Sequence, residues 1–264
     1  MTTLFDATLA LARLLGNVRD STTTGAGTAT TVVDSTRTEA DDFWNGGTLW
    51  VTSGTQSGKS RKITDWAFTG TTFTIPTTST AVGSSATYSV ITADWPQDKL
   101  NSFINAALRD IGDVPAEDAT LTTVGGQEQY TLPTGVSDVR MVEVAQSEDT
   151  PYSYQPIWNW RELPTGELQF DTGREPGDTG FYIRLTYMDA HAVMTADTST
   201  VSTYVHLDRL TWAAAVHAWR WRMQVAKTDE PMYQLFYQEA VAQAEKYKRI
   251  RPTPYIPRPV RLSL

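Results

Sequence analysis

The chain contains 264 residues, of which 40% are hydrophobic and 20% are charged, and its net charge is −8. This length suits one large domain or two small ones, and the composition excludes broad disorder. The acidic excess argues against a general nucleic-acid-binding surface. The absence of cysteine excludes disulfides, a thiol nucleophile and Cys-ligated zinc. No apolar run reaches the ~20 residues of a membrane helix and no secretory signal is evident, so we expect no membrane contact and synthesis in a reducing cytosol.

The N-terminal third is predicted to form a helix and then a β domain. Apolar residues at helical spacing predict a helix within residues 1–20. Residues 21–93 are rich in Ser and Thr, and turn signals separate their short β-like runs, which favours a small barrel or sandwich. The runs are Thr30–Val33, Thr48–Thr52, Arg61–Asp65, Thr71–Ile75 and Thr87–Ile91. A flexible Thr-rich linker is the alternative, but the Trp and Phe residues of this segment argue against it.

A second helix and a second β region follow. Within residues 94–116, the apolar side chains from Leu100 to Ile111 form one continuous stripe, which predicts an amphipathic helix over residues 95–111. Residues 117–200 return to β patterning, with strand-like runs at Val139–Val144 and Gly180–Tyr187.

Residues 201–249 are predicted to form two helices, at 202–226 and 231–249, joined by a short turn. The first carries apolar residues on two faces and is therefore expected to be buried on two sides. A neighbouring subunit on one side and a central position within a monomer explain this pattern equally well.

Residues 250–264 contain four prolines and are predicted to be extended. Six basic and no acidic residues occur from Lys246 onward, and the remaining 16 basic and 30 acidic residues give residues 1–245 a net charge of −14. Apolar residues such as Tyr255 and Ile256 favour an arm that orders on a partner. A disordered solubilising end and an arm that contacts DNA phosphates are the alternatives.

No motif predicts catalysis, a cofactor or a metal. Residues 53–60 resemble a phosphate-binding loop, but Ser53 replaces its first glycine and a strand-like run follows, so we predict a hairpin turn. His206 and Asp208 would lie on different sides of a helix, and His217 among tryptophans is expected to be a packed or interface histidine. Trp44, Trp50 and Trp66 are expected in a core or interface; the alternative is a sugar-stacking surface.

The predicted fold class is α+β. It has a helical core made of the N-terminal helix, the central helix and the C-terminal helix pair. Two β-rich segments, one of them a small barrel-like or sandwich-like insertion, and an extended C-terminal arm complete it.

The order of segments carries a resemblance. The runs Gly27–Asp34, Asp41–Leu49 and Thr52–Asp65 resemble a β domain common in tailed-bacteriophage virion proteins. Trp95–Ile111, Gln129–Pro133, Ile183–Tyr187 and the closing helix pair are similar to the head-to-tail adaptor, or connector, family. The resemblance covers nearly the whole chain and includes no catalytic signature.

The resemblance implies a structural virion protein of the phage neck rather than an enzyme. Such proteins form a homo-oligomeric ring, usually of about twelve subunits, that joins the portal protein to the stopper or tail-tube terminator protein. DNA passes through the lumen without specific recognition, and the protein is made in the host bacterial cytoplasm. By this analogy the portal-docking arm comprises Arg251, Tyr255, Ile256, Arg258, Arg261 and Leu264, and the ring interface comprises Val205, Trp212, Trp219, Trp221 and Phe236.

Two other function classes stay open at this point. One is another virion component, such as a tail-completion or decoration protein. The other is a carbohydrate-binding protein that uses the Trp-bearing β domain.

Overall fold

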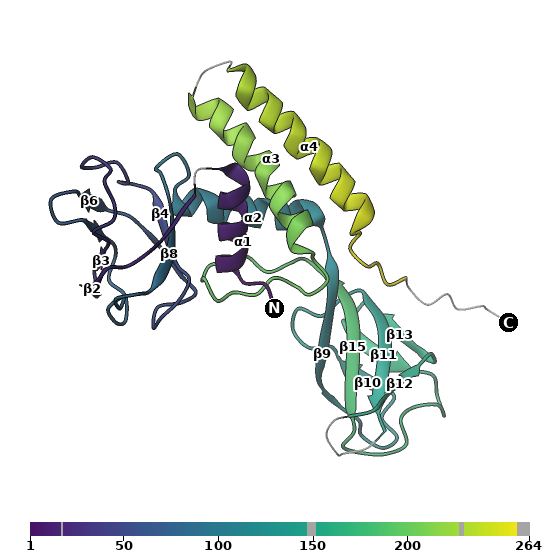
Figure 1. The fold of residues 1–264 in the computed structure, drawn as a ribbon. Coiled ribbons are helices and arrows are strands. Elements are labelled where there is room, and N and C mark those ends of the chain that lie inside the picture. Colours follow the sequence, from purple (N-terminus) through teal and green to yellow (C-terminus); the bar gives the residue numbers. More distant parts are fainter. Residues whose placement is uncertain (17, 147–151, 227–229, 258–264) are drawn as a thin grey trace. The chain divides into compact units, whose positions relative to one another are not determined.

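The computed structural model describes residues 1–16, 18–146, 152–226 and 230–257. It divides into two compact units (Figure 1). Unit 1 comprises Met1–Ile111 and Ala192–Pro252, and unit 2 comprises Gly112–His191 and Thr253–Leu264. Both units are therefore built from segments that are distant in the sequence.

Two small antiparallel sheets form the β part of unit 1. The first has the order β1-β8-β4-β5, with bounds Arg19–Thr22, Thr87–Ile91, Thr48–Val51 and Lys59–Lys62. The second has the order β2-β3-β7-β6, with bounds Gly25–Thr28, Thr31–Val33, Thr72–Thr74 and Asp65–Ala67. Both sheets contribute to one buried cluster that includes Trp44, Trp66, Phe73 and Tyr88. This cluster makes the pair of sheets a sandwich.

The helices of unit 1 are α1 (Leu4–Leu15), α2 (Gln97–Ile111), α3 (Leu207–Ala226) and α4 (Pro231–Ile250). A capping box begins α1, because the Thr3 hydroxyl accepts from the Asp6 amide and the Asp6 carboxylate accepts from the Thr3 amide. Helix α3 packs against α1, α2 and α4, and Figure 1 shows α3 and α4 as an antiparallel hairpin.

Unit 2 is a second sandwich of antiparallel sheets. One sheet has the order β12-β11-β15-β9, with bounds Tyr154–Ile157, Val139–Ala145, Tyr182–Asp189 and Val114–Thr122. The other has the order β10-β14-β13, with bounds Gln129–Thr131, Glu167–Phe170 and Trp160–Leu163. Their inner faces share a core that includes Val142, Leu168, Phe170 and Leu185.

The prediction of a helical core was wrong. The structure is rich in β-sheet, with four small sheets and four helices in the described residues, and the two buried clusters above lie between sheets. Among the described residues of α4, the buried one is Ala240. Sequence periodicity made the helices the predicted core, because the apolar stripe of a helix is long and regular. Strands β3 and β7 each bury a single residue and therefore give a weak signal in the sequence. Such strands build a core only when they pack together.

Candidate assembly surface on the helical hairpin

Local sequence signals define the α3–α4 hairpin. Pro231 occupies the first turn of α4, where its missing N–H would have no intrahelical partner. Lys248 and Arg249 lie in the last turn, where positive charge is favourable near the free carbonyl groups. These signals begin and end α4 within one residue of the predicted limits.

The tryptophans predicted at a ring interface pack within unit 1. Trp219 is buried, and its ring centre lies 4.9 Å from that of Phe236 and 5.3 Å from that of Trp95. Trp221 is half-buried, with its ring centre 6.1 Å from Trp95 and 5.7 Å from Phe103. Aromatic contacts therefore join α3 to α4, to α2 and to Trp95, which lies two residues before α2.

The remaining predicted ring residues differ in exposure. Val205 is buried just before α3, whereas Trp212 and Phe236 are half-buried on α3 and α4. A role for these residues between subunits stays a prediction.

The last residues of α3 and the first residues of α4, whose ribbons end together at one end of the hairpin in Figure 1, carry exposed apolar side chains. Val225, Met232 and Leu235 are 52%, 60% and 62% exposed, and we call these three residues the apolar tip. Met232 and Leu235 are three positions apart and so share one face of α4. This surface was not predicted, although the stretch Pro231–Gln238 contains no charged residue and Met232 and Leu235 have the spacing of one helical face.

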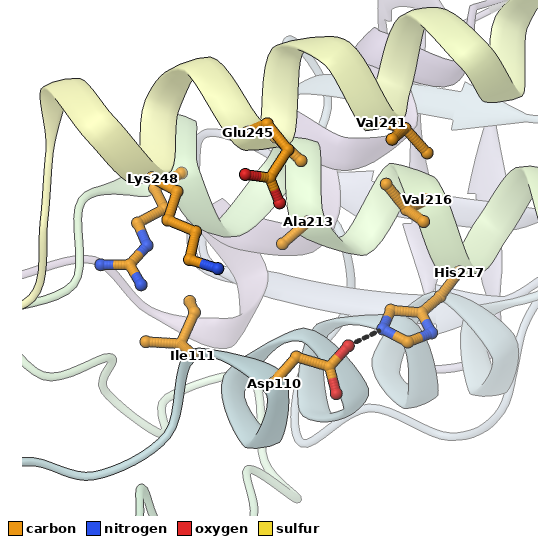
Figure 2. A pocket seen from close by; sticks show the side chains of 10 residues that line it. Asp110, Ile111, Ala213, Val216, His217, Val241, Glu245 and Lys248 are labelled. Carbon is orange, nitrogen blue, oxygen red and sulfur yellow. Dashed lines mark hydrogen bonds and ion pairs between the residues drawn. The ribbon is translucent and has the colours of Figure 1, made fainter.

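A pocket of about 210 Å³ lies between the end of α2, the middle of α3 and the second half of α4 (Figure 2). We call it the three-helix pocket. Its apolar lining comprises Ile111, Ala213, Val216, Val241 and Ala244, and its charged or titratable lining comprises Asp110, Arg209, His217, Glu245 and Lys248. His217 Nε2 lies 2.7 Å from Asp110 Oδ2 on one side of the pocket. Glu245 and Lys248 extend from α4 on the other side.

Arg209 ties the pocket to the end of α4. Its side chain is buried, and Nη1 donates a hydrogen bond to the carbonyl oxygen of Arg251 at 3.2 Å. Burial lowers the pKa of the Arg209 guanidinium, because the charged form loses hydration. The Arg251 amide also donates to the Tyr247 carbonyl at 2.8 Å, so both backbone groups of Arg251 are held.

The first part of the predicted arm lies in the described residues. Arg251 and Tyr255 are exposed, and Ile256 is half-buried. Within unit 2, Arg140 Nη1 donates to the Tyr255 hydroxyl at 2.9 Å, and the guanidinium carbon of Arg140 lies 5.0 Å from the centre of that ring. Asp138 accepts hydrogen bonds from the same guanidinium. Arg258, Arg261 and Leu264 lie outside the described residues.

Comparison with known families identifies the chain. The sequence pattern of the SU10 adaptor protein family matches residues 76–261, which is more than half of the chain. The chain belongs to the SU10 adaptor protein family. Membership makes it a structural adaptor of a phage virion that contacts other neck or tail components. No curated protein sequence matches the chain.

The phosphate-loop-like stretch of this SU10 adaptor is a hairpin turn, as predicted. Residues 53–58 join β4 to β5, which pair in antiparallel fashion. Ser60 has a structural role: its amide and hydroxyl donate to the Asp197 carboxylate at 3.0 and 2.5 Å, and Gln97 donates to its hydroxyl at 2.6 Å. The Ser60 hydroxyl, which would face a metal ion in a nucleotide site, therefore makes hydrogen bonds within the protein.

The interpretation of the first β domain as a sugar-stacking surface is wrong. Trp44, Trp50 and Trp66 are at most 1% exposed, so their ring faces are not available to a saccharide. Trp50 Nε1 donates to the Thr8 hydroxyl at 3.1 Å and links the sandwich to α1. The expectation that these tryptophans lie in a core is confirmed.

Neither a metal-binding cluster nor a membrane-spanning helix occurs in the described residues. In the part of the chain that the structure describes, no group of three His, Asp or Glu side chains is placed to hold a metal ion. His206 is exposed just before α3. None of the described helices combines the length and apolar character needed to cross a bilayer.

Proposed function

We propose that this SU10 adaptor forms a closed ring in the phage neck, of about twelve subunits, which joins the portal to the stopper or tail. Membership of the family over residues 76–261 is the observation that carries the proposal. DNA passes through the lumen of the ring. The portal, the stopper or tail terminator, and further copies of the chain are its partners.

Two surfaces of the α3–α4 hairpin are evidence in favour of a ring. An exposed apolar tip and an open three-helix pocket are different surfaces on one hairpin, and contact between different surfaces generates rings when the rotation closes. Covering solvent-exposed apolar groups with a neighbouring subunit lowers the free energy, because it removes apolar surface from water.

The exposure and the charge of the C-terminal segment favour a role in docking on the portal. Arg251 and Tyr255 are exposed, and Arg258 and Arg261 add positive charge to a proline-rich extended sequence. Arginine pairs well with carboxylates on a partner. We assign portal docking to residues 250–264.

The charge distribution supports DNA passage without binding. Residues 1–245 carry a net charge of −14, counted from 16 basic and 30 acidic residues. Nonspecific affinity for DNA comes from neutralising its phosphates, so an acidic lumen would retain little DNA.

Mass photometry of the purified protein, alone and mixed with the portal ring of its phage, tests this function. We expect one discrete complex that contains about twelve added copies on each portal ring. A variant that lacks residues 258–264 is the matched sample, and we expect it to leave the portal ring without added mass. A protein that stays monomeric and ignores the portal would exclude the adaptor ring and favour a different position in the virion.

A further inference from the structure

We propose that the apolar tip of one copy inserts into the three-helix pocket of a second copy, and that this contact is the repeating joint of the ring. The inference rests on the proposed function, since it requires a homo-oligomer. It assigns Leu235 and Met232 as the inserted side chains and the pocket between α2, α3 and α4 as their acceptor.

The size and lining of the pocket fit an aliphatic side chain. Its volume is about 210 Å³, and a cavity of roughly 150 Å³ is enough to hold a benzene ring. Five aliphatic residues line it, and Val241 at its edge is 36% exposed. A leucine or methionine from outside would therefore meet apolar atoms and displace water from them.

The charges beside the two surfaces are complementary. Glu230, the N-cap of α4 and two residues before Met232 of the apolar tip, is exposed. Lys248 lines the pocket, and Lys246 and Arg249 lie on the same half of α4. The pocket is also lined by two carboxylates, Asp110, which is paired with His217, and Glu245. Glu245 is the one acidic residue of the second half of α4, which carries three cations. Glu230 of an incoming tip would be attracted by Lys248 at the pocket and by Lys246 and Arg249 beside it.

The occupant must come from another copy. Leu235 and Ala244 are nine residues apart on one continuous helix, roughly 14 Å along its axis. A rigid helix cannot fold its own Leu235 into a pocket lined by its own Ala244. Each copy offers one tip and one pocket, so the contacts run head to tail, the type of contact that gives a ring when the rotation between copies closes.

Disulfide trapping tests the joint, and the absence of native cysteine leaves no background. In the full-length double variant Leu235→Cys/Ala244→Cys, the two thiols of neighbouring copies would come within disulfide range. Under mild oxidation we expect a ladder of covalent oligomers on a non-reducing gel, in the fraction that mass photometry shows to be a ring. The control Leu235→Cys/Lys246→Cys places the second thiol on an exposed position outside the pocket lining, and we expect no ladder.

A ring that assembles without the ladder, or one whose control pair traps equally well, would overturn the joint and leave the ring intact. Absence of any ring from the unmodified protein would instead overturn the proposed function.

A second pair of variants measures the joint without cysteine. Leu235→Ser should weaken assembly at least tenfold and leave the melting temperature of the monomer unchanged, because Leu235 is 62% exposed. Gln238→Ser, at an exposed position one turn away, should assemble normally. Equal assembly by the two variants would refute the insertion of Leu235.

Discussion

At the scale of single residues, Gly47 shows how closely two strands of the first sandwich approach. A Cβ at this position would lie 2.1 Å from the Ile91 carbonyl oxygen and 3.0 Å from the Trp44 carbonyl oxygen. The Gly47 backbone also accepts a hydrogen bond from the Ile63 amide at 2.8 Å. A side chain here would push backbone against backbone, and neither can rotate away.

Gly47→Ala should therefore lower the free energy of unfolding by about 2–3 kcal/mol. Gly83→Ala is the matched control, because nothing lies within 4 Å of the position its Cβ would take. Urea denaturation of both variants measures the difference. Equal stability of the two would show that the strands do not approach so closely.

Asp34 is a buried carboxylate held by hydroxyl groups. Its oxygens accept from Ser21 Oγ at 2.6 Å, Thr36 Oγ1 at 2.6 Å and Tyr88 Oη at 2.5 Å. Burial alone would raise the pKa of Asp34, but these hydrogen bonds to the charged form lower it overall. Burial and the Asp34 charge raise the pKa of the Tyr88 hydroxyl, which stays protonated and continues to donate.

This lowered pKa predicts an acid dependence of stability. Because the folded-state pKa lies below the unfolded value of about 3.9, the contribution of Asp34 is present above that value and is lost as pH falls through the folded pKa. Asp34→Asn should destabilise the protein by about 2–3 kcal/mol at pH 7, and the gap to the unmodified protein should narrow below about pH 4.

Thermal unfolding between neutral and acid pH measures that gap. Asp113→Asn, at an exposed position, is the control and should follow the unmodified protein. A gap for Asp34→Asn that stays constant across the pH range would contradict the assignment.

At the scale of elements, aromatic residues of α3 and α4 contact one another within the subunit, whereas the aliphatic residues of the apolar tip are exposed to solvent. The rings of Trp219 and Tyr233 stack with centres 6.0 Å apart, and Phe236 lies closer still. Aromatic side chains therefore contact one another inside the hairpin, whereas the residues of the apolar tip are exposed. We therefore expect substitutions of the buried Trp219 to lower the stability of the monomer and substitutions of the apolar tip to weaken assembly.

Trp219→Ala should lower the free energy of unfolding of the monomer by about 3–4 kcal/mol, because a large buried ring is removed. Chemical denaturation at a concentration where the protein is monomeric measures this effect. Trp219→Phe keeps an aromatic ring and should recover part of the loss. A Trp219→Ala monomer of unchanged stability that fails to assemble would instead support a direct place for Trp219 between subunits.

At the scale of the whole molecule, charge separates the end of α4 and the arm from the rest of the chain. The six basic residues from Lys246 onward contrast with the acidic remainder of the chain. Arg140 contacts Tyr255 of the arm, and both residues belong to unit 2. We expect the arginines of the arm to make ionic contacts with the portal, and salt screens such contacts.

Binding to the portal ring should therefore weaken by about tenfold between roughly 0.05 and 0.5 M salt. Surface plasmon resonance on immobilised portal rings measures this dependence. The double variant Arg258→Gln/Arg261→Gln should bind more weakly at low salt and show a shallower salt dependence. Affinity that does not change with salt would argue that the arm docks through its apolar residues alone.

Sequence periodicity anticipated the helices well because each is one continuous segment with a regular pattern. The limits of α2 and α4 differ from the predicted ones by no more than two residues. The turn at residues 53–58 was also predictable, because the strand-like run after Lys59 is incompatible with a phosphate-binding helix. Strands β1, β2 and β6 were missed, since three or four residues with one buried side chain or none leave little signal.

The sequence by itself determined the charge separation, the positions of the helices and the membership of an adaptor family, because these depend on composition, local periodicity and residue order. Only the tertiary structure decided which aromatic residues are used internally, where the buried clusters lie and which apolar groups stay exposed. Trp219 and Leu235 are both apolar residues on amphipathic helices, yet one is buried and the other is 62% exposed. Their difference arises from the packing of α3 against α2 and α4, which brings together residues more than a hundred positions apart.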